Sequence, residues 1–133
     1  MTKYLNIKNC WAKIKSEKGT DQFVDRFYKV LFTRFPDTRE LFPKDITTQK
    51  RKLLTTLDNA INGIEYIDDI REEMLALGQH HKELGITSEM YDAFIITILD
   101  AADFASNSTL TTDECTAWEN AFREISDIML EAY

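Results

Sequence analysis

Apolar residues recur at intervals of three and four through most of this chain, and this spacing constrains its fold more than any other feature. The clearest row is Ile67, Ile70, Met74 and Leu77, and one more step of four reaches His81. Residues at this spacing share one face of an α-helix, because the helix turns once every ~3.6 residues. The row therefore predicts an amphipathic helix whose buried face ends in a histidine.

Similar rows and their stop signals predict the remaining elements. Pro36 ends one helix and starts a short separate turn that reaches Phe42. Thr111 followed by Glu114 is a capping box that should start the last helix. Two helices are expected before Pro36, one over 4–16 and one over 21–35 with Thr20 or Asp21 as its cap. After the turn, a helix should run from Thr47 or Thr48 to about Asn62, and the helix that carries the histidines should stop at Gly85. The next helix is expected from Thr87 or Ser88 to a break at Asn107.

Few residues interrupt these rows, since the chain has only four glycines and two prolines. No alternating run of β-branched residues reaches strand length. We therefore expect an all-α protein of about seven helices, packed as a single domain over 1–133 and steeply enough to surround a pocket.

The composition argues against several function classes. The chain has 23 acidic and 16 basic residues, and no basic run interleaved with aromatics, so nucleic-acid binding is not expected. No apolar run approaches the ~20 residues that a membrane helix needs, and the N-terminus is too polar for a signal peptide. A cytoplasmic protein without membrane partners is the expectation. Two distant cysteines, Cys10 and Cys115, predict reduced thiols rather than a disulfide framework or a zinc site.

The histidine pair has two readings on spacing alone. A histidine that ends an apolar helix face is commonly a hydrogen-bonded core or capping residue, and less often a metal ligand. His80 stays open as well, because it lies a step of three from Leu77. A site built from protein ligands alone would need three or four, and no HExxH or cysteine pair is present. A metal inside a cofactor needs only one or two protein ligands.

Several runs together resemble a known family. They are FYKVLFTRFPDTRELF, TTQKRKLL, LGQHHKELGI followed by Tyr91 ten residues after His81, and AWENAF near the end. In this order they are similar to globins, most closely to bacterial single-domain globins related to flavohaemoglobin. The resemblance spans nearly the whole chain and implies a globin fold with haem b as cofactor.

The resemblance also implies roles for particular residues. His81 matches the proximal histidine that binds haem iron, and Phe42 matches the phenylalanine that stacks on the porphyrin. Tyr28, Gln49 and Leu53 match the distal side, where hydroxyl and amide donors can stabilise negative charge on a bound gas. Outside the resemblance, Tyr28 would be a core tyrosine and Gln49 an exposed residue near a helix start.

Further residues are expected to contact haem, although their apolar rows fit an ordinary core equally well. Lys52 and Lys82 could reach the haem propionates or simply face water. The expected wall residues are Leu53, Leu77, Ile86, Tyr91, Phe94, Ile98 and Trp118.

The chain departs from the flavohaemoglobin pattern in two places. It has no GxGxxG motif before it ends at Tyr133, so we expect any electrons to come from a separate reductase. Counting from Trp118, Tyr133 falls where that group has a glutamate beside the proximal histidine, and Glu131 comes two residues early. A carboxylate partner for His81 is therefore not expected, and a backbone carbonyl about one turn earlier should accept its second N–H instead.

The leading functional expectation is reversible binding of dioxygen, or of other diatomic gases, for storage, scavenging or transport. Two distal donors suit tight binding, and they suit nitric oxide dioxygenation with an external reductase as the alternative. A haem-based gas sensor is a third possibility. A haem-free interaction module is disfavoured by His81 and Phe42 together.

Overall fold

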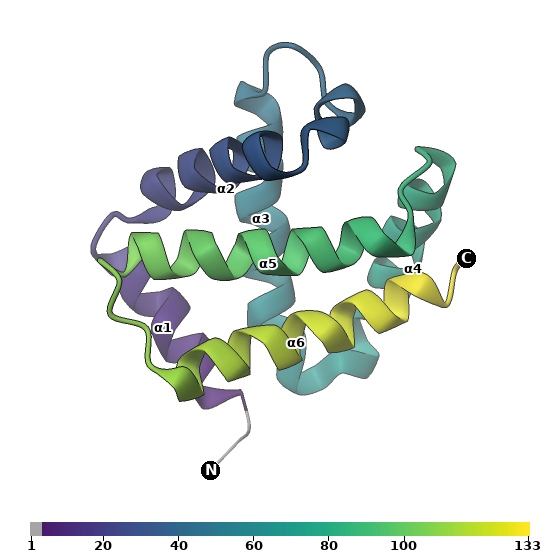
Figure 1. The fold of residues 1–133 in the computed structure, drawn as a ribbon. Helices are drawn as coiled ribbons and strands as arrows, with labels where there is room; N and C mark the ends of the chain where they lie inside the picture. The colour runs from purple at the N-terminus through teal and green to yellow at the C-terminus, as the bar shows by residue number, and fades with distance from the viewer. Residues whose placement is uncertain (1–3) are drawn as a thin grey trace.

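The computed structural model describes residues 4–133, and within them every secondary-structure element is a helix. Figure 1 shows the arrangement. The elements are α1 (Leu5–Ser16), α2 (Thr20–Arg34), η1 (Pro36–Leu41), α3 (Thr47–Gly63), η2 (Ile64–Tyr66), α4 (Ile67–Glu83), α5 (Ser88–Ala105) and α6 (Thr112–Leu130), where η marks a 3₁₀ helix. The predicted all-α fold is confirmed, and the one element not anticipated is η2, which joins α3 to α4 without a loop.

The strongest local signals produced the expected boundaries. Pro36 occupies the first turn of η1. At α6 the Thr111 hydroxyl accepts a hydrogen bond from the Glu114 N–H at 3.1 Å, while the Glu114 carboxylate accepts one from the Thr111 N–H at 3.0 Å. This capping box satisfies two N–H groups that would otherwise lack partners at the helix start.

Of the weaker helix-start predictions, two are confirmed, because α3 begins at Thr47 and Thr87 is the N-cap residue of α5, and one is displaced by a residue, at α2. Thr20 lies inside α2, whose first flanking residue is Gly19. Ahead of α3 the Asp45 carboxylate accepts from the Thr47 N–H at 3.0 Å and from the Thr47 hydroxyl at 2.8 Å. The first N–H of α3 therefore has a side-chain partner in the preceding loop, which the pattern of threonines did not predict.

The helices pack in crossing pairs rather than as an aligned bundle. α2 packs along α5, and α4 along α6, while α3 crosses behind α5 in Figure 1. An aromatic cluster fills the core beside α1: the rings of Trp11 and Phe23 lie 5.3 Å apart, and Trp118 lies 6.1 Å from Trp11. Such edge-to-face contacts consolidate one end of the core. The other end, between α2, α3 and α4, is hollow.

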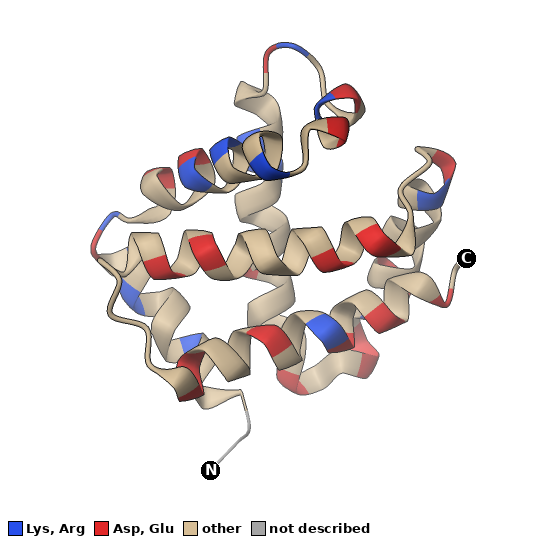
Figure 2. Ribbon diagram, viewed as in Figure 1, with Lys and Arg blue, Asp and Glu red and all other residues tan. Residues whose placement is uncertain are grey.

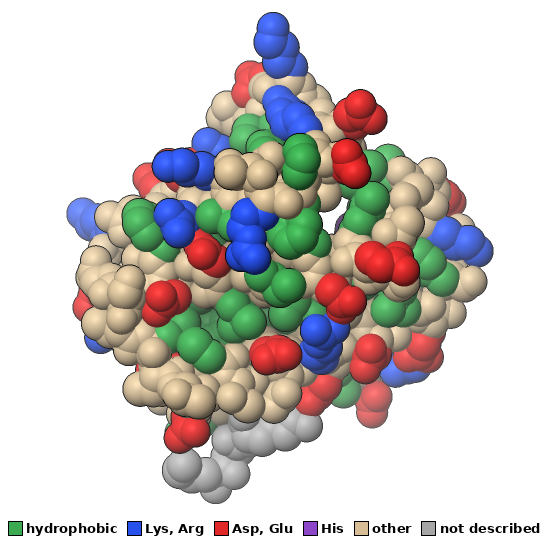
Figure 3. All heavy atoms as spheres, in the orientation of Figure 1, with side chains coloured by type: hydrophobic (Ala, Val, Ile, Leu, Met, Phe, Trp, Pro, Cys, Tyr) green, Lys and Arg blue, Asp and Glu red, His purple; other side chains and the backbone are tan. Residues whose placement is uncertain are grey.

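Charge is unevenly spread over the surface. Lys and Arg gather on α2 and the neighbouring η1 region, whereas Asp and Glu extend along α5 and α6 (Figure 2). On the face seen in Figure 3, isolated charges alternate with hydrophobic side chains. Among the described residues, no helix combines the length and the apolar character needed to cross a membrane.

Candidate functional site

A cavity of about 510 Å³ opens at the hollow end of the core. Its size lies within the range of small-molecule and cofactor pockets, ~300–1,000 Å³. Most of the residues expected at the site line it together: Tyr28, Phe42, Gln49, Leu53, Leu77, His81, Ile86, Tyr91 and Phe94. Segments far apart in sequence therefore meet at one mainly apolar pocket.

Two expected wall residues lie elsewhere. Ile98 and Trp118 are fully buried, with 0% exposure, but they are outside the cavity lining. Trp118 stacks on Phe23 at 6.2 Å and on Phe122 at 6.0 Å, within the aromatic core. Core and pocket positions carry the same apolar residues at the same spacing, so the pattern could not separate them.

The sequence reading missed part of the lining. Three residues of α6 that the sequence analysis did not assign to the site also line the cavity: Phe122, Ile125 and Met129. Thr38 was not anticipated at all, although its hydroxyl is satisfied by donating to the Phe35 carbonyl at 2.6 Å. The contact of these α6 residues with the cavity depends on how α6 packs against α4, which the sequence of α6 alone does not determine.

His81 enters the cavity from the last turn of α4. Its Nδ1 lies 3.1 Å from the Tyr91 hydroxyl, and the two rings meet edge to face at 5.8 Å. Burial lowers the pKa of His81, and the neighbouring His80 lowers it further. A lowered pKa favours the neutral imidazole, which is the form that binds metals. His80 also borders the cavity but is exposed.

The Tyr91 hydroxyl has a further partner in Tyr133, which lies at the position that the register from Trp118 gave it, and not in Glu131. The Tyr133 hydroxyl lies 3.3 Å from the Tyr91 hydroxyl and donates to the Ile86 carbonyl at 2.7 Å. Glu131 instead pairs with Arg71. The expectation that a backbone carbonyl accepts directly from His81 is wrong, because the Tyr91 hydroxyl occupies that position.

Tyr28 enters the same cavity from α2 and is only 3% exposed. Its ring is enclosed by Phe27 at 5.0 Å, Phe42 at 5.5 Å and Phe32 at 5.7 Å. Burial raises the pKa of the Tyr28 hydroxyl, so it stays protonated and able to donate. Its acceptor in the protein is the Gln49 backbone carbonyl at 3.4 Å, a long contact that leaves the donor weakly engaged.

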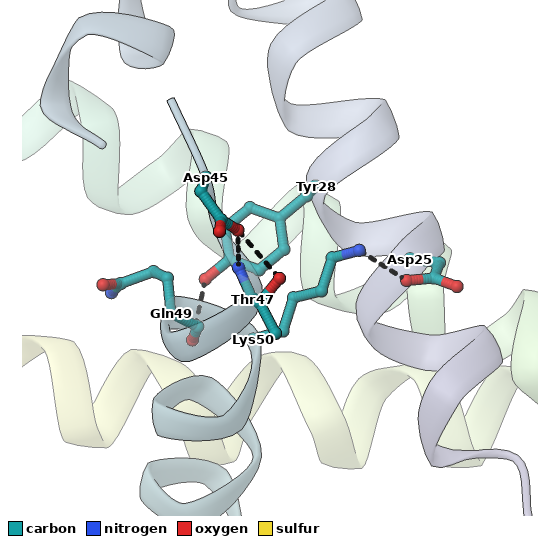
Figure 4. Close-up of polar contacts among 6 residues, drawn as sticks. All are labelled: Asp25, Tyr28, Asp45, Thr47, Gln49 and Lys50. Carbon is teal, nitrogen blue, oxygen red and sulfur yellow. Dashed lines mark hydrogen bonds and ion pairs between the residues drawn. The ribbon is translucent and has the colours of Figure 1, made fainter. Parts of the chain in front are cut away.

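The first turn of α3 is held against α2 by polar contacts (Figure 4). Lys50 pairs with Asp25 at 2.9 Å, next to the Asp45 contacts with Thr47. In Figure 4 the Gln49 side chain extends away from the Tyr28 ring, and only its backbone carbonyl meets the tyrosine. Gln49 is still one of the residues that line the cavity, together with Tyr28.

The donor set fits a metal carried inside a cofactor. Over residues 4–133 no group of three or more His, Cys, Asp or Glu side chains is placed to hold a bare ion. One neutral imidazole in an apolar pocket suits a macrocycle that supplies its own remaining ligands. Of the two lysines considered for propionates, Lys52 borders the cavity, whereas Lys82 is simply exposed.

Comparisons with known proteins agree with this geometry. The chain is 29% identical over 110 residues to a Flavohemoprotein of Bacillus subtilis, covering 79% of this chain and 27% of that protein. It is 22% identical over 117 residues to Flavohemoprotein B of Dictyostelium discoideum, covering 87% and 28%. The chain thus spans only about a quarter of these curated relatives.

A shorter relative and a solved structure match over more of their length. An uncharacterized globin-like protein of Aquifex aeolicus is 24% identical over 106 residues, which is 80% of this chain and 74% of that one. The structure of a bacterial globin from Campylobacter jejuni superposes with a TM-score of 0.83 at 22% identity, covering 98% and 93% of the two chains. The family model for globins matches residues 25–129. By this match and by its fold, the chain belongs to the globin family.

Proposed function

We propose that this globin binds haem b with His81 as the protein ligand of the iron, and that it binds dioxygen reversibly on the side of Tyr28 and Gln49. The observation that carries the proposal is that His81 and Tyr28, from α4 and α2, line one apolar cavity of about 510 Å³. Haem, when bound, supplies the ferrous iron at which dioxygen binds.

The chain's own residues would do three things at this site. His81, kept neutral by burial, would present an imidazole nitrogen. Phe42 and Leu53 would pack against the macrocycle and exclude water, which strengthens polar interactions inside the pocket. Tyr28 would donate a hydrogen bond from its protonated hydroxyl, and Gln49 would add its amide.

A buried hydroxyl donor beside the gas-binding space favours slow release, and the Gln49 amide would add a second donor if its side chain turned toward Tyr28. A hydrogen bond from a buried hydroxyl is worth ~1 kcal/mol net and more when it meets developing charge. Tyr28 is well suited because its present acceptor, the Gln49 carbonyl, is 3.4 Å away and is given up at little cost. This supports tight binding or scavenging over easy release.

The proposal is tested by absorption spectra of purified protein in ferric, ferrous and dioxygen-exposed samples. We expect a Soret band in the wild type, and its loss or strong weakening in His81→Ala. His80→Ala is the matched control, because it removes the adjacent, exposed imidazole and should retain haem. Wild-type protein without a Soret band after haem addition would overturn the proposal, and loss of haem in His80→Ala alone would reassign the ligand.

Nitric oxide dioxygenation is the second candidate function. It is favoured by the similarity to two proteins named flavohemoproteins, in which a region like this one forms about a quarter of the chain. Here a separate reductase would restore ferrous iron after each turnover. Sustained consumption of nitric oxide over many turnovers with a reductase and NAD(P)H would support this function, and a single turnover that then stops would contradict it.

A further inference from the structure

Three hydrogen-bonding groups form a continuous chain behind His81. Its Nδ1 lies 3.1 Å from the Tyr91 hydroxyl, which lies 3.3 Å from the Tyr133 hydroxyl, which lies 2.7 Å from the Ile86 carbonyl oxygen. Tyr91 is only 6% exposed, so water has little access to the middle of the chain. The two tyrosine rings also meet edge to face at 5.9 Å, which fixes their relative orientation.

The chemistry of the last group sets the direction of every proton in this chain. A backbone carbonyl can only accept, so the Tyr133 hydroxyl donates its single proton to Ile86. The Tyr133 oxygen can then only accept a hydrogen bond from the Tyr91 hydroxyl, which donates its single proton to it. The Tyr91 oxygen is left as an acceptor, and the group that faces it, Nδ1 of His81, must be the donor.

We propose that Tyr133 is a positioning residue for His81, which acts through Tyr91 to hold the imidazole as the tautomer protonated on Nδ1. This tautomer leaves the lone pair on Nε2. In a histidine ligand, the hydrogen bond made by one ring nitrogen decides which nitrogen is free to bind metal. The inference rests on the proposed function only in assigning the iron to Nε2.

This series of hydrogen bonds ends at Ile86, just after the helix that carries His81. The N–H of Ile86 donates to the His81 backbone carbonyl at 3.0 Å, so Ile86 is tied both to the histidine backbone and, through two tyrosines, to its ring. Gly85 makes this turn with a positive φ of 84°, a conformation that glycine adopts without strain. The ring is therefore oriented relative to its own helix end.

The hydrogen-bonded series behind His81 consists of two hydroxyls and a carbonyl and includes no carboxylate. Glu131, the carboxylate nearest in sequence to Tyr133, is engaged by Arg71 and does not join it. A carbonyl at the end withdraws the Nδ1 proton less than a carboxylate would, because a hydrogen bond to an ionised acceptor is roughly twice as strong. His81 should thus be an ordinary neutral imidazole ligand, with little imidazolate character.

The test compares Tyr133→Phe with the wild type, and with Tyr66→Phe as a matched control that removes the hydroxyl of a tyrosine 66% exposed on η2. In the full chain loaded with haem, reduced and bound to carbon monoxide, the Nδ1 proton of His81 is observed by NMR. We expect it to exchange with solvent at least tenfold faster in Tyr133→Phe and at the wild-type rate in Tyr66→Phe. Equal rates in all three proteins would overturn the proposal.

A second variant and a second measurement distinguish an effect on the His81 tautomer from a loss of haem binding or of the fold. Tyr91→Phe should give the same increase, and adding Tyr133→Phe to it should change nothing more, because both act through one chain. In haem-free full-length protein, the ring ¹⁵N shifts of His81 should report Nδ1–H in the wild type and a mixture in Tyr133→Phe, while His80 stays unchanged as the internal reference. Wild-type protein that shows this tautomer but takes up no haem would contradict the proposed function and leave the inference standing.

Discussion

Gly78 lies directly against the backbone of Met129. A β-carbon placed at position 78 would come within 2.2 Å of the Met129 carbonyl oxygen and 2.7 Å of its Cα. Such distances are far inside van der Waals contact, and backbone atoms cannot rotate away as a side chain can. Gly78 stands three residues before His81, so this contact sets how closely the histidine helix α4 approaches α6.

We expect Gly78→Ala to destabilise the protein in spite of the higher helix propensity of alanine. Propensity alone would favour alanine by ~1 kcal/mol, but forcing α4 away from α6 costs on the order of 1–3 kcal/mol and shifts His81 as well. Chemical denaturation should show the lower free energy of unfolding, and the rate of haem loss should rise. Gln79→Ala on the exposed side of α4 serves as the control, and unchanged stability in Gly78→Ala would show that the helices adjust freely.

Tyr28→Phe should speed dissociation of dioxygen several-fold or more. The substitution keeps the ring among Phe27, Phe32 and Phe42 and removes only the hydroxyl, whose lost hydrogen bond is worth ~1 kcal/mol. Laser photolysis or stopped-flow displacement with carbon monoxide measures the off-rate. Tyr66→Phe, on the surface, should keep the wild-type rate, and an unchanged rate in Tyr28→Phe would remove Tyr28 from the gas-binding role.

Trp118→Phe should leave the haem spectrum unchanged while lowering stability, because Trp118 belongs to the aromatic core and lies outside the cavity lining. Trimming a fully buried indole to a phenyl ring is expected to cost on the order of 1 kcal/mol in the free energy of unfolding. Phe42→Leu is the comparison, since Phe42 lines the cavity and its loss should alter the Soret band or speed haem loss. A Soret shift in Trp118→Phe would restore Trp118 as a haem contact.

The sequence predicted those parts of the fold that depend on local signals. The stripe from Ile67 to His81, the break at Pro36 and the capping box at Thr111 each follow from periodicity, proline geometry or a short hydrogen-bonded motif, and each appears where expected. These signals need no knowledge of neighbouring helices, because they reflect the conformation of a few consecutive residues.

What the sequence did not predict depends on how helices cross. The approach of Gly78 to Met129 and the division of α6 between core and cavity are set by packing of segments about fifty residues apart along the chain. The choice of His81 over His80 also lay beyond spacing and came from the family resemblance. In the structure His81 contacts Tyr91 of the next helix, and the spacing of residues within one helix cannot predict such a contact.

The last prediction concerns acid stability and the contact between α1 and α3. Asp58 accepts hydrogen bonds from Lys15 at 2.6 Å and from the indole of Trp11 at 3.0 Å, and these contacts lower the pKa of its carboxyl. A carboxyl whose pKa is lower in the folded than in the unfolded state stabilises the fold above its unfolded pKa of ~3.9, and this contribution is lost as the pH falls through the folded value.

Asp58→Asn should therefore be less stable than the wild type at pH 7, and the difference should shrink once the pH drops below about 4. Denaturant unfolding of the two proteins at several pH values measures the gap directly. Glu73→Gln, which neutralises an exposed carboxylate on α4, should show a small difference throughout. An equal difference in the free energy of unfolding between Asp58→Asn and the wild type at low and neutral pH would contradict this prediction. It would show that Asp58 stabilises the fold through its shape and contacts and not through the charge of its carboxylate.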